Sequence, residues 1–311
     1  RPDFLKVVFA GSGRDAEIGG GEAYGVMEMR DTEIKTLSDR MDELARSLIT
    51  SINRIHSQGN GLVRYTGTVE STNLVSNPTA LLNSLPELPY DVTNGTFQML
   101  VYDDATNTVA ETVTVPVTTG ATTVASIVSA INTSTNLTAA VTPDGMLQIT
   151  PSGGHSFIFA NDTSGALTAL GINGFFTGAD AATIGVNQDM LNDPRLISSR
   201  YSTNPLETGV NDLALDMAAL RNSNLMTNSQ TFNSYYESTT VDLGVRSRLN
   251  NDTYNASQSF LSEVQTRRQE TSGVNLDEEV TFLLLYQRAF QASSRVISIA
   301  DGMLDNLMKA F

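Results

Sequence analysis

Apolar residues recur at helical spacing close to the beginning of the chain. Between residues 32 and 57 they are separated alternately by three and four positions, which predicts a long helix with a coiled-coil-like seam. The seam consists of Ile34, Leu37, Met41, Leu44, Leu48, Ser51 and Ile55. The sequence Gly59-Asn60-Gly61 follows and is typical of a helix end.

The helical period disappears between about residues 62 and 187. Short runs at 96–102 and 111–115 alternate apolar and polar residues, which is typical of half-buried strands. Pro143-Asp144-Gly145 separates two further alternating runs and predicts the tip of a hairpin. One short helix is expected at about 123–132. The middle of the chain is therefore predicted to be a β-rich domain with a helical interruption.

The helical period returns at 212–222, at 229–271 and at 277–311. The second of these stretches keeps one narrow apolar face among many Ser and Asn residues. The third has an uninterrupted seam with further apolar residues beside it, so its apolar surface is wider than a two-stranded coiled coil requires. That seam consists of Leu283, Tyr286, Phe290, Ser293, Ile297, Ala300, Leu304, Leu307 and Phe311. We expect this helix to be covered by an absent N-terminal part or by other subunits.

The complete pattern predicts an α+β multidomain fold, in which a long α-helical coiled-coil-like region carries an inserted β-rich domain. We expect a helical part with N-terminal strands at 1–61 and an outer β-rich domain at 62–208. A return to the helical domain follows at 209–272, and a terminal assembly helix at 273–311. The chain opens in a strand-like run at 4–9 without an initiator Met, and we interpret it as a fragment of a longer protein.

Charge and composition exclude several classes of partner. The chain has 19 Lys and Arg against 34 Asp and Glu, a net charge of -15, which disfavours nucleic acid and anionic membranes as main partners. Residues 61–208 contain 3 basic and 12 acidic residues, so this part presents a different surface from the ends. The absence of cysteine excludes disulfides and thiolate sites. No apolar run reaches the roughly 18 residues of a membrane span, and no cleavable signal is visible.

Few residues are candidates for catalysis or metal binding. We interpret His56 and His155 as surface residues, because a metal site or triad would need both histidines together with distant carboxylates. Asp103-Asp104 lacks the spacing of a calcium loop and indicates a hairpin turn. The acidic run at 277–279 fits the first turn of a helix capped by Asn275 or Asp277. We therefore expect no metal, no cofactor and no enzymatic activity.

Two stretches resemble one family of flagellar proteins. The first is SGVNLDEE at 272–279, followed by YQRAFQASSR at 286–295. The second is GVMEMRD at 25–31, followed by a helix that ends in NRIHSQG at 53–59. In this order they are similar to hook-associated protein 1 of the bacterial flagellum, with Phe290 where that family more commonly has Tyr. The β segment at 95–173 is more loosely similar to a motif inserted in flagellin and hook-associated proteins.

This resemblance implies a structural subunit at the hook–filament junction, here a C-terminal fragment lacking the family's N-terminal helix. It implies an extracellular location in the flagellum after export by the flagellar secretion system. The implied partners are other copies of itself in a ring, the hook protein, the next hook-associated protein and an export chaperone at the C-terminal helix. Neither nucleic acid nor membrane insertion is expected.

The resemblance and the seams together suggest contact residues. Those expected to contact a chaperone and then neighbouring subunits are Leu283, Tyr286, Phe290, Ile297, Leu304 and Leu307. The helical-domain seam is Ile34, Leu37, Met41, Leu44, Leu48 and Ile55. A surface adhesin or glycan-binding module centred on residues 62–187, with the helices as a stalk, remains the alternative. An enzyme is the weakest hypothesis, because no nucleophile, base and orienting group occur together.

Overall fold

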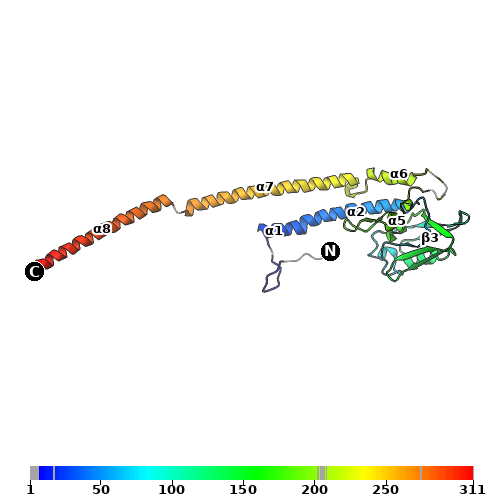
Figure 1. Ribbon diagram of the computed structural model, residues 1–311, viewed down its shortest axis with the longest axis horizontal. Helices are drawn as coiled ribbons and strands as arrows, with labels where there is room; N and C mark the ends of the chain where they lie inside the picture. The colour runs from blue at the N-terminus through cyan, green and yellow to red at the C-terminus, as the bar shows by residue number, and fades with distance from the viewer. Residues whose placement is uncertain are drawn as a thin grey trace. The chain divides into compact units, whose positions relative to one another are not determined.

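The computed structural model describes residues 7–16, 18–201, 203, 207, 209–273 and 275–310 (Figure 1). The chain divides into two compact units, Arg1–Val241 and Asp242–Phe311. Three sets of residues named in the predictions lie outside the described ones: residues 4–6 of the strand-like run, Val274 of the 272–279 motif, and Phe311 of the terminal seam.

Both units contain helices, and the strands all belong to the first. The helical elements of the first unit are α1 (Gly21–Glu28), the π-helical turn η1 (Met29–Glu33), α2 (Ile34–His56), η2 (Leu82–Ser84), α3 (Val124–Ile131), α4 (Ala166–Leu170), α5 (Gln188–Asn192), η3 (Pro194–Leu196), α6 (Asp212–Ala219), η4 (Leu220–Asn222), η5 (Thr227–Ser229) and the beginning of α7 (Phe232–Ser272). The strands are β1 (Val69–Glu70), β2 (Gly95–Asp103), β3 (Thr108–Val117), β4 (Leu137–Val141), β5 (Leu147–Pro151), β6 (His155–Ala160), β7 (Phe176–Thr177) and β8 (Gly185–Val186). The second unit consists of the rest of α7 and α8 (Leu276–Lys309).

The first helix is longer than its periodicity predicts. Helix α1, the turn η1 and α2 follow one another without a break, so the helix begins at Gly21 rather than near residue 32. In η1 the amide of Ile34 donates to the carbonyl oxygen of Met29, five residues earlier. Such a π turn holds one more residue than an α turn. The extra residue breaks the three-and-four spacing, which is why the pattern before Ile34 did not indicate a helix.

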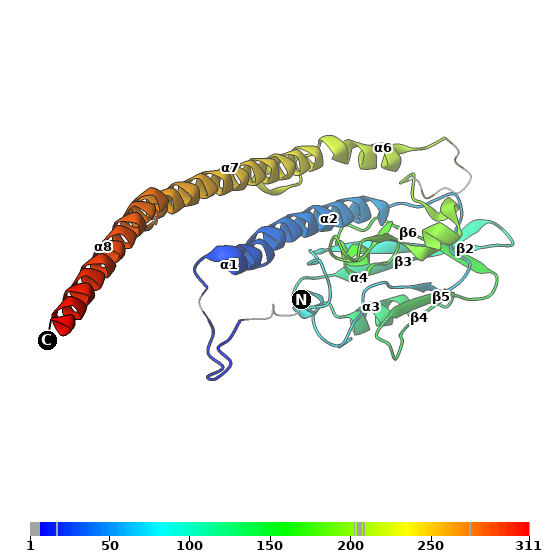
Figure 2. The same cartoon turned by 60° about the vertical axis from the view of Figure 1, so that its left-hand side comes forward.

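The β-rich part contains two three-stranded antiparallel sheets with the orders β3-β2-β6 and β1-β5-β4. Figure 2 shows β2, β3 and β6 as one layer and β4 and β5 as another. One continuous apolar core joins the two sheets. It includes Phe97, Met99, Val115, Ile149, Phe157 and Phe159, each no more than 1% exposed. Residues of both sheets share this core, and a second, smaller buried cluster consists of Leu100, Tyr102, Ile158 and Ala160.

The local predictions in the β-rich part are confirmed. Strands β4 and β5 form the expected hairpin, with Val141 paired to Leu147. At its tip Gly145 has a φ of +83°, and a β-carbon there would lie 2.8 Å from the carbonyl oxygen of Val75, so only glycine fits. The expected short helix is α3, whose cap Thr123 accepts a hydrogen bond from the amide of Ser126.

The turn between β2 and β3 also has the predicted form. One carboxylate oxygen of Asp103 accepts hydrogen bonds from the amides of Ala105 and Thr106, at 2.8 and 2.9 Å. Asn107 completes the turn with a φ of +55°, a conformation that Asn tolerates better than most residues. Asp103 and Asp104 thus belong to a hairpin turn.

The second unit is entirely helical in its described residues, apart from the short connection between α7 and α8. Helix α8 begins as predicted, because the side chain of Asn275 accepts a hydrogen bond from the amide of Asp277 at 3.1 Å. Three acidic residues occupy its first turn and Lys309 its last, which complements the helix dipole. Together the two units confirm an α+β fold with long helices and a β-rich middle.

Candidate assembly surface

Helix α8 leaves its apolar face uncovered. The six predicted contact residues on it are between 59 and 74% exposed, and none of its described residues is buried. Val280, Phe282, Val296, Ile299 and Met303 beside them are also at least half exposed. Since burying one such side chain is worth about 2 kcal/mol, this face favours packing against another chain.

The part of α7 in the second unit has a narrower face of the same kind. Val245, Leu249, Phe260 and Val264 are between 45 and 67% exposed. Leu243, Tyr254 and Leu261 are exposed outside this face. Most other positions are polar, with ion pairs at i,i+4 spacing between Asp242 and Arg246 and between Glu263 and Arg267, which are worth only a few tenths of a kcal/mol each. The helix therefore also depends on contacts beyond those of its own unit.

Helix α2 buries a different face from the predicted seam. The residues that it buries against the first unit are Ala45, Ile49, Asn53 and His56. Of the predicted seam, Ile34 is 57% exposed, whereas Leu37, Met41, Leu44, Leu48 and Ile55 are half-buried. At 3.6 residues per turn the seam lies roughly a quarter of a turn away from the buried residues. It is therefore only partly covered within the chain.

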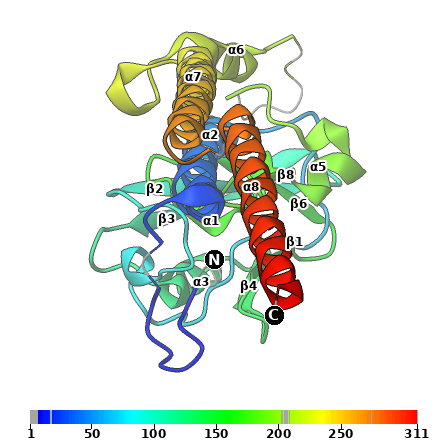
Figure 3. The same cartoon turned by 90° about the vertical axis from the view of Figure 1, so that its left-hand side faces the viewer.

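The buried end of α2 is joined to the β-rich part by polar side chains. The side chain of Asn53 accepts from the amide of Phe176 and donates to its carbonyl oxygen, both at 2.8 Å. Asn173 donates to the carbonyl oxygens of Ser57 and Gly59 and accepts from the hydroxyl of Tyr65 at 2.9 Å. We call these residues together with His56 the polar joint. Figure 3 shows α2 end-on against the β-rich part.

His56 lies in the middle of the polar joint, and the prediction of a surface residue was wrong. It is fully buried. Its Nδ1 lies 2.8 Å from the carbonyl oxygen of Asn173, and its Nε2 accepts from the amide of Ser198 at 2.9 Å. These partners require a neutral ring protonated at Nδ1. Burial accordingly lowers the pKa of His56 from 6.5 to about 4.

The beginning of α7 packs on another side of α2 within the first unit. The hydroxyl of Tyr235 donates to one carboxylate oxygen of Glu43 at 2.7 Å, and the hydroxyl of Thr227 donates to the other. The bond from Thr227, followed by that from Tyr235, lowers the pKa of Glu43. Burial and the neighbouring carboxylate raise the pKa of Tyr235 to about 12. This contact fixes the start of α7 against α2.

Neither the polar joint nor the Glu43 contact was predicted. Their partners lie far apart in the sequence, 117 residues for His56 and Asn173 and 192 for Tyr235 and Glu43. The one available signal was the i,i+3 pair Asn53 and His56 at the end of a strongly amphipathic helix.

No helix in the described part of the chain is both long and apolar enough to cross a membrane.

Comparisons with known proteins match both helical regions. Residues 2–69 match the family model for the flagellar hook-associated protein FlgK helical domain, and residues 265–310 match that for the flagellar basal body rod FlgEFG protein C-terminal region. Flagellar hook-associated protein 1 of Salmonella typhimurium is 28% identical over 131 residues, covering 41% of this chain and 24% of that protein. The protein of the same name from Bacillus subtilis is 28% identical over 97 residues, 29% of this chain and 19% of that protein.

The alignments thus span about a quarter or less of the length of these relatives. The C-terminal match defines the class of protein, one that shares its terminal helical region with axial proteins of the bacterial flagellum. The helical match at 2–69 and the two relatives specify the resemblance further: this chain is similar to flagellar hook-associated protein 1.

Proposed function

We propose that the chain is a structural subunit of the flagellum at the hook–filament junction and acts by packing its long helices against neighbouring subunits. The observation that carries this proposal is the uncovered apolar face of α8, which coincides with the match at 265–310. A helix that leaves large apolar side chains more than half exposed is suited to assembly. The stripe on α2 that begins at Ile34 would supply a second contact.

The partners in this proposal are other copies in a ring, the hook protein and the next hook-associated protein. Before assembly, an export chaperone would cover α8, because an exposed apolar helix in an unassembled subunit promotes aggregation. The flagellar secretion system would export the chain to its extracellular site. In this role the protein needs no enzymatic activity. The adhesin alternative is not favoured by the family matches, which cover residues 2–69 and 265–310 and thus little of the β-rich part.

Substitutions on the two sides of α8 test the proposal. Phe290→Glu and Leu304→Glu place a charge in the exposed seam, and we expect each to abolish incorporation into hook–filament junctions in cells. The free energy of unfolding of the isolated chain should change by less than about 0.5 kcal/mol, because both side chains are exposed in it.

Ser298→Glu is the matched control, because Ser298 is exposed on the polar side of the same helix, beside Gln291, Ser294 and Asp305. It should assemble normally. Normal assembly of both seam variants would contradict the proposed role of α8.

A further inference from the structure

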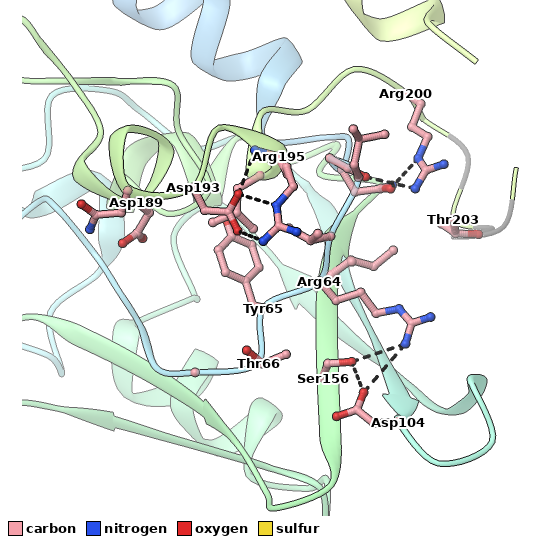
Figure 4. Close-up of a pocket in the computed structure, with 18 of the residues that line it drawn as sticks. Arg64, Tyr65, Thr66, Asp104, Ser156, Asp189, Asp193, Arg195, Arg200 and Thr203 are labelled. Carbon is pink, nitrogen blue, oxygen red and sulfur yellow. Dashed lines mark hydrogen bonds and ion pairs between the residues drawn. The ribbon is translucent and has the colours of Figure 1, made fainter. Parts of the chain in front are cut away.

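A pocket of about 590 Å³ lies in the first unit beside the stretch at 60–68 (Figure 4). Its other walls come from the β2–β3 turn, with Asp104 and Asn107, from β6, with Ser156 and Ile158, and from residues around α5 and η3. The exposed helical faces do not include it, whereas Tyr65 of the polar joint lies in its wall. The pocket is therefore separate from the surfaces considered for assembly.

All the basic residues of the predicted β-rich domain line this one pocket. Residues 61–208 contain twelve Asp and Glu but only Arg64, Arg195 and Arg200 as cations. All three arginines belong to the lining, and Figure 4 shows them around the pocket. In a segment with a net charge of -9, these three side chains concentrate the positive charge in one place.

The three guanidinium groups have different partners. Arg195 pairs with both carboxylate oxygens of Asp193, at 2.9 and 2.7 Å, so its charge is balanced. Arg200 is 3% exposed, and within the described part of the chain it donates to uncharged oxygens: the side chain of Asn60 and the carbonyls of Gly61 and Glu207. A buried guanidinium held without a carboxylate is costly and attracts an anion.

Arg64 is held beside the same end of the pocket. Its guanidinium lies 3.9 Å from the ring centroid of Tyr102 and donates to Asn107 and Ser156. Its only carboxylate in the described part of the chain is Asp104, at 3.9 Å, beyond hydrogen-bond distance. The Asp104 carboxylate instead accepts a 2.5 Å hydrogen bond from Ser156.

The charge in the pocket is consequently uneven. Burial raises the pKa of the Tyr102 phenol, and Arg64 and Arg200 both oppose that rise, so both cations act at the Tyr102 end. Of the described carboxylates that line the pocket, Asp104 is the one within 4 Å of either of these guanidinium groups. Asp193 is paired with Arg195. The remaining carboxylate of the lining, Asp189, acts on Tyr65 instead: burial and the charge of Asp189 raise the pKa of the Tyr65 phenol. The Tyr102 end therefore carries an excess of positive charge.

We propose that Arg64 and Arg200 form a binding site for a carboxylate at the Tyr102 end of this pocket. The fork of Arg64 is held by stacking and hydrogen bonds, so a planar carboxylate can accept from it without further ordering of the side chain. The carboxylate could come from an acidic side chain of a neighbouring protein, including a second copy of this chain, or from a small free anion. The proposal does not rest on a role in the flagellum.

Calorimetric titration of the full chain with citrate and with triglutamate, each up to about 10 mM, tests this site and distinguishes the two sources. Tighter binding of triglutamate indicates an acidic side chain, and tighter binding of citrate a small anion. Arg64→Gln should weaken binding about tenfold or more, since a charge-assisted pair is lost. Arg54→Gln removes the same charge from an exposed position outside the pocket and should leave binding unchanged.

A gain of affinity gives the sharper test. Asp104 lies in an exposed turn, and its carboxylate competes with the ligand's carboxylate for Arg64. Asp104→Asn removes this competing charge and should tighten binding severalfold. A merely destabilised protein would not bind more tightly, so this result cannot come from misfolding of a variant. Absence of binding to both ligands, or equal weakening by Arg54→Gln and Arg64→Gln, would overturn the proposal.

Discussion

At the scale of single residues, the junction between α2 and the β-rich part depends on buried polar groups with fixed roles. The side-chain amide of Asn53 satisfies both backbone groups of Phe176. His56 must accept from the amide of Ser198 while its other nitrogen faces the carbonyl oxygen of Asn173. Buried polar groups of this kind stabilise a structure only while every partner is present. The joint is therefore sensitive to a single proton.

The stability of the chain should depend on pH through His56. Its pKa is lowered from 6.5 to about 4 on folding, so between these values the unfolded chain binds a proton that the folded chain does not. The contribution of neutral, buried His56 to the free energy of unfolding is fully present above pH 6.5 and decreases as the pH falls toward 4. The slope is about 1.4 kcal/mol per pH unit, and the total loss roughly 3 kcal/mol.

Urea unfolding of the wild type and of His56→Gln at a series of pH values between 4 and 7 measures this dependence. Glutamine cannot take up a proton in this range, so the variant should be less stable at pH 7 and have a shallower slope. Equal slopes for the two proteins would show that protonation of His56 does not limit acid stability.

At the scale of elements, the π turn η1 determines which residues share a face with the α2 seam. The five-residue step across the turn places Met29 in line with Ile34, and Val26 lies one turn before Met29. Val26, Met29 and Ile34 are 64, 49 and 57% exposed. Together with the half-buried seam they form a longer apolar stripe than the sequence period indicated.

Deletion of Thr32 tests the role of this turn. Without the extra residue the turn should become α-helical, and Val26 and Met29 should rotate by about 100° away from the stripe. Because both side chains are exposed, we expect the melting temperature of the isolated chain to change little and incorporation into the flagellum to fall.

Deletion of Gly11, which has no atom within 4 Å of a β-carbon position, is the control and should affect neither property. A clear decrease in the melting temperature on deletion of Thr32 would mean that the stripe is packed within the chain.

Most elements could be predicted from periodicity, because their signals lie within about ten residues. The seam that starts at Ile34, the hairpin at Gly145 and the capped start of α8 at Asn275 are of this kind. The π turn was missed because one additional residue erases the period. The burial of His56 was missed because its partners come from distant segments, and Arg64 and Arg200 likewise line one pocket from distant segments.

At the scale of the whole molecule, the chain combines one well-packed part with long, uncovered helices. The β-rich part surrounds a continuous apolar core, whereas the described residues of α8 bury nothing. Isolated helices are marginally stable in water without tertiary packing. We therefore expect α8 to become stably ordered only when neighbouring subunits cover its apolar face.

Amide hydrogen exchange across residues 276–309 tests this claim most directly. It should be measured by mass spectrometry on the full chain alone and after addition of isolated hook structures. We expect rapid exchange in the chain alone and strong protection of α8 in the presence of hooks, with little change in the β-rich core. Strong protection of α8 in the isolated chain, or no increase in protection with hooks, would show that α8 does not depend on neighbouring subunits for its order.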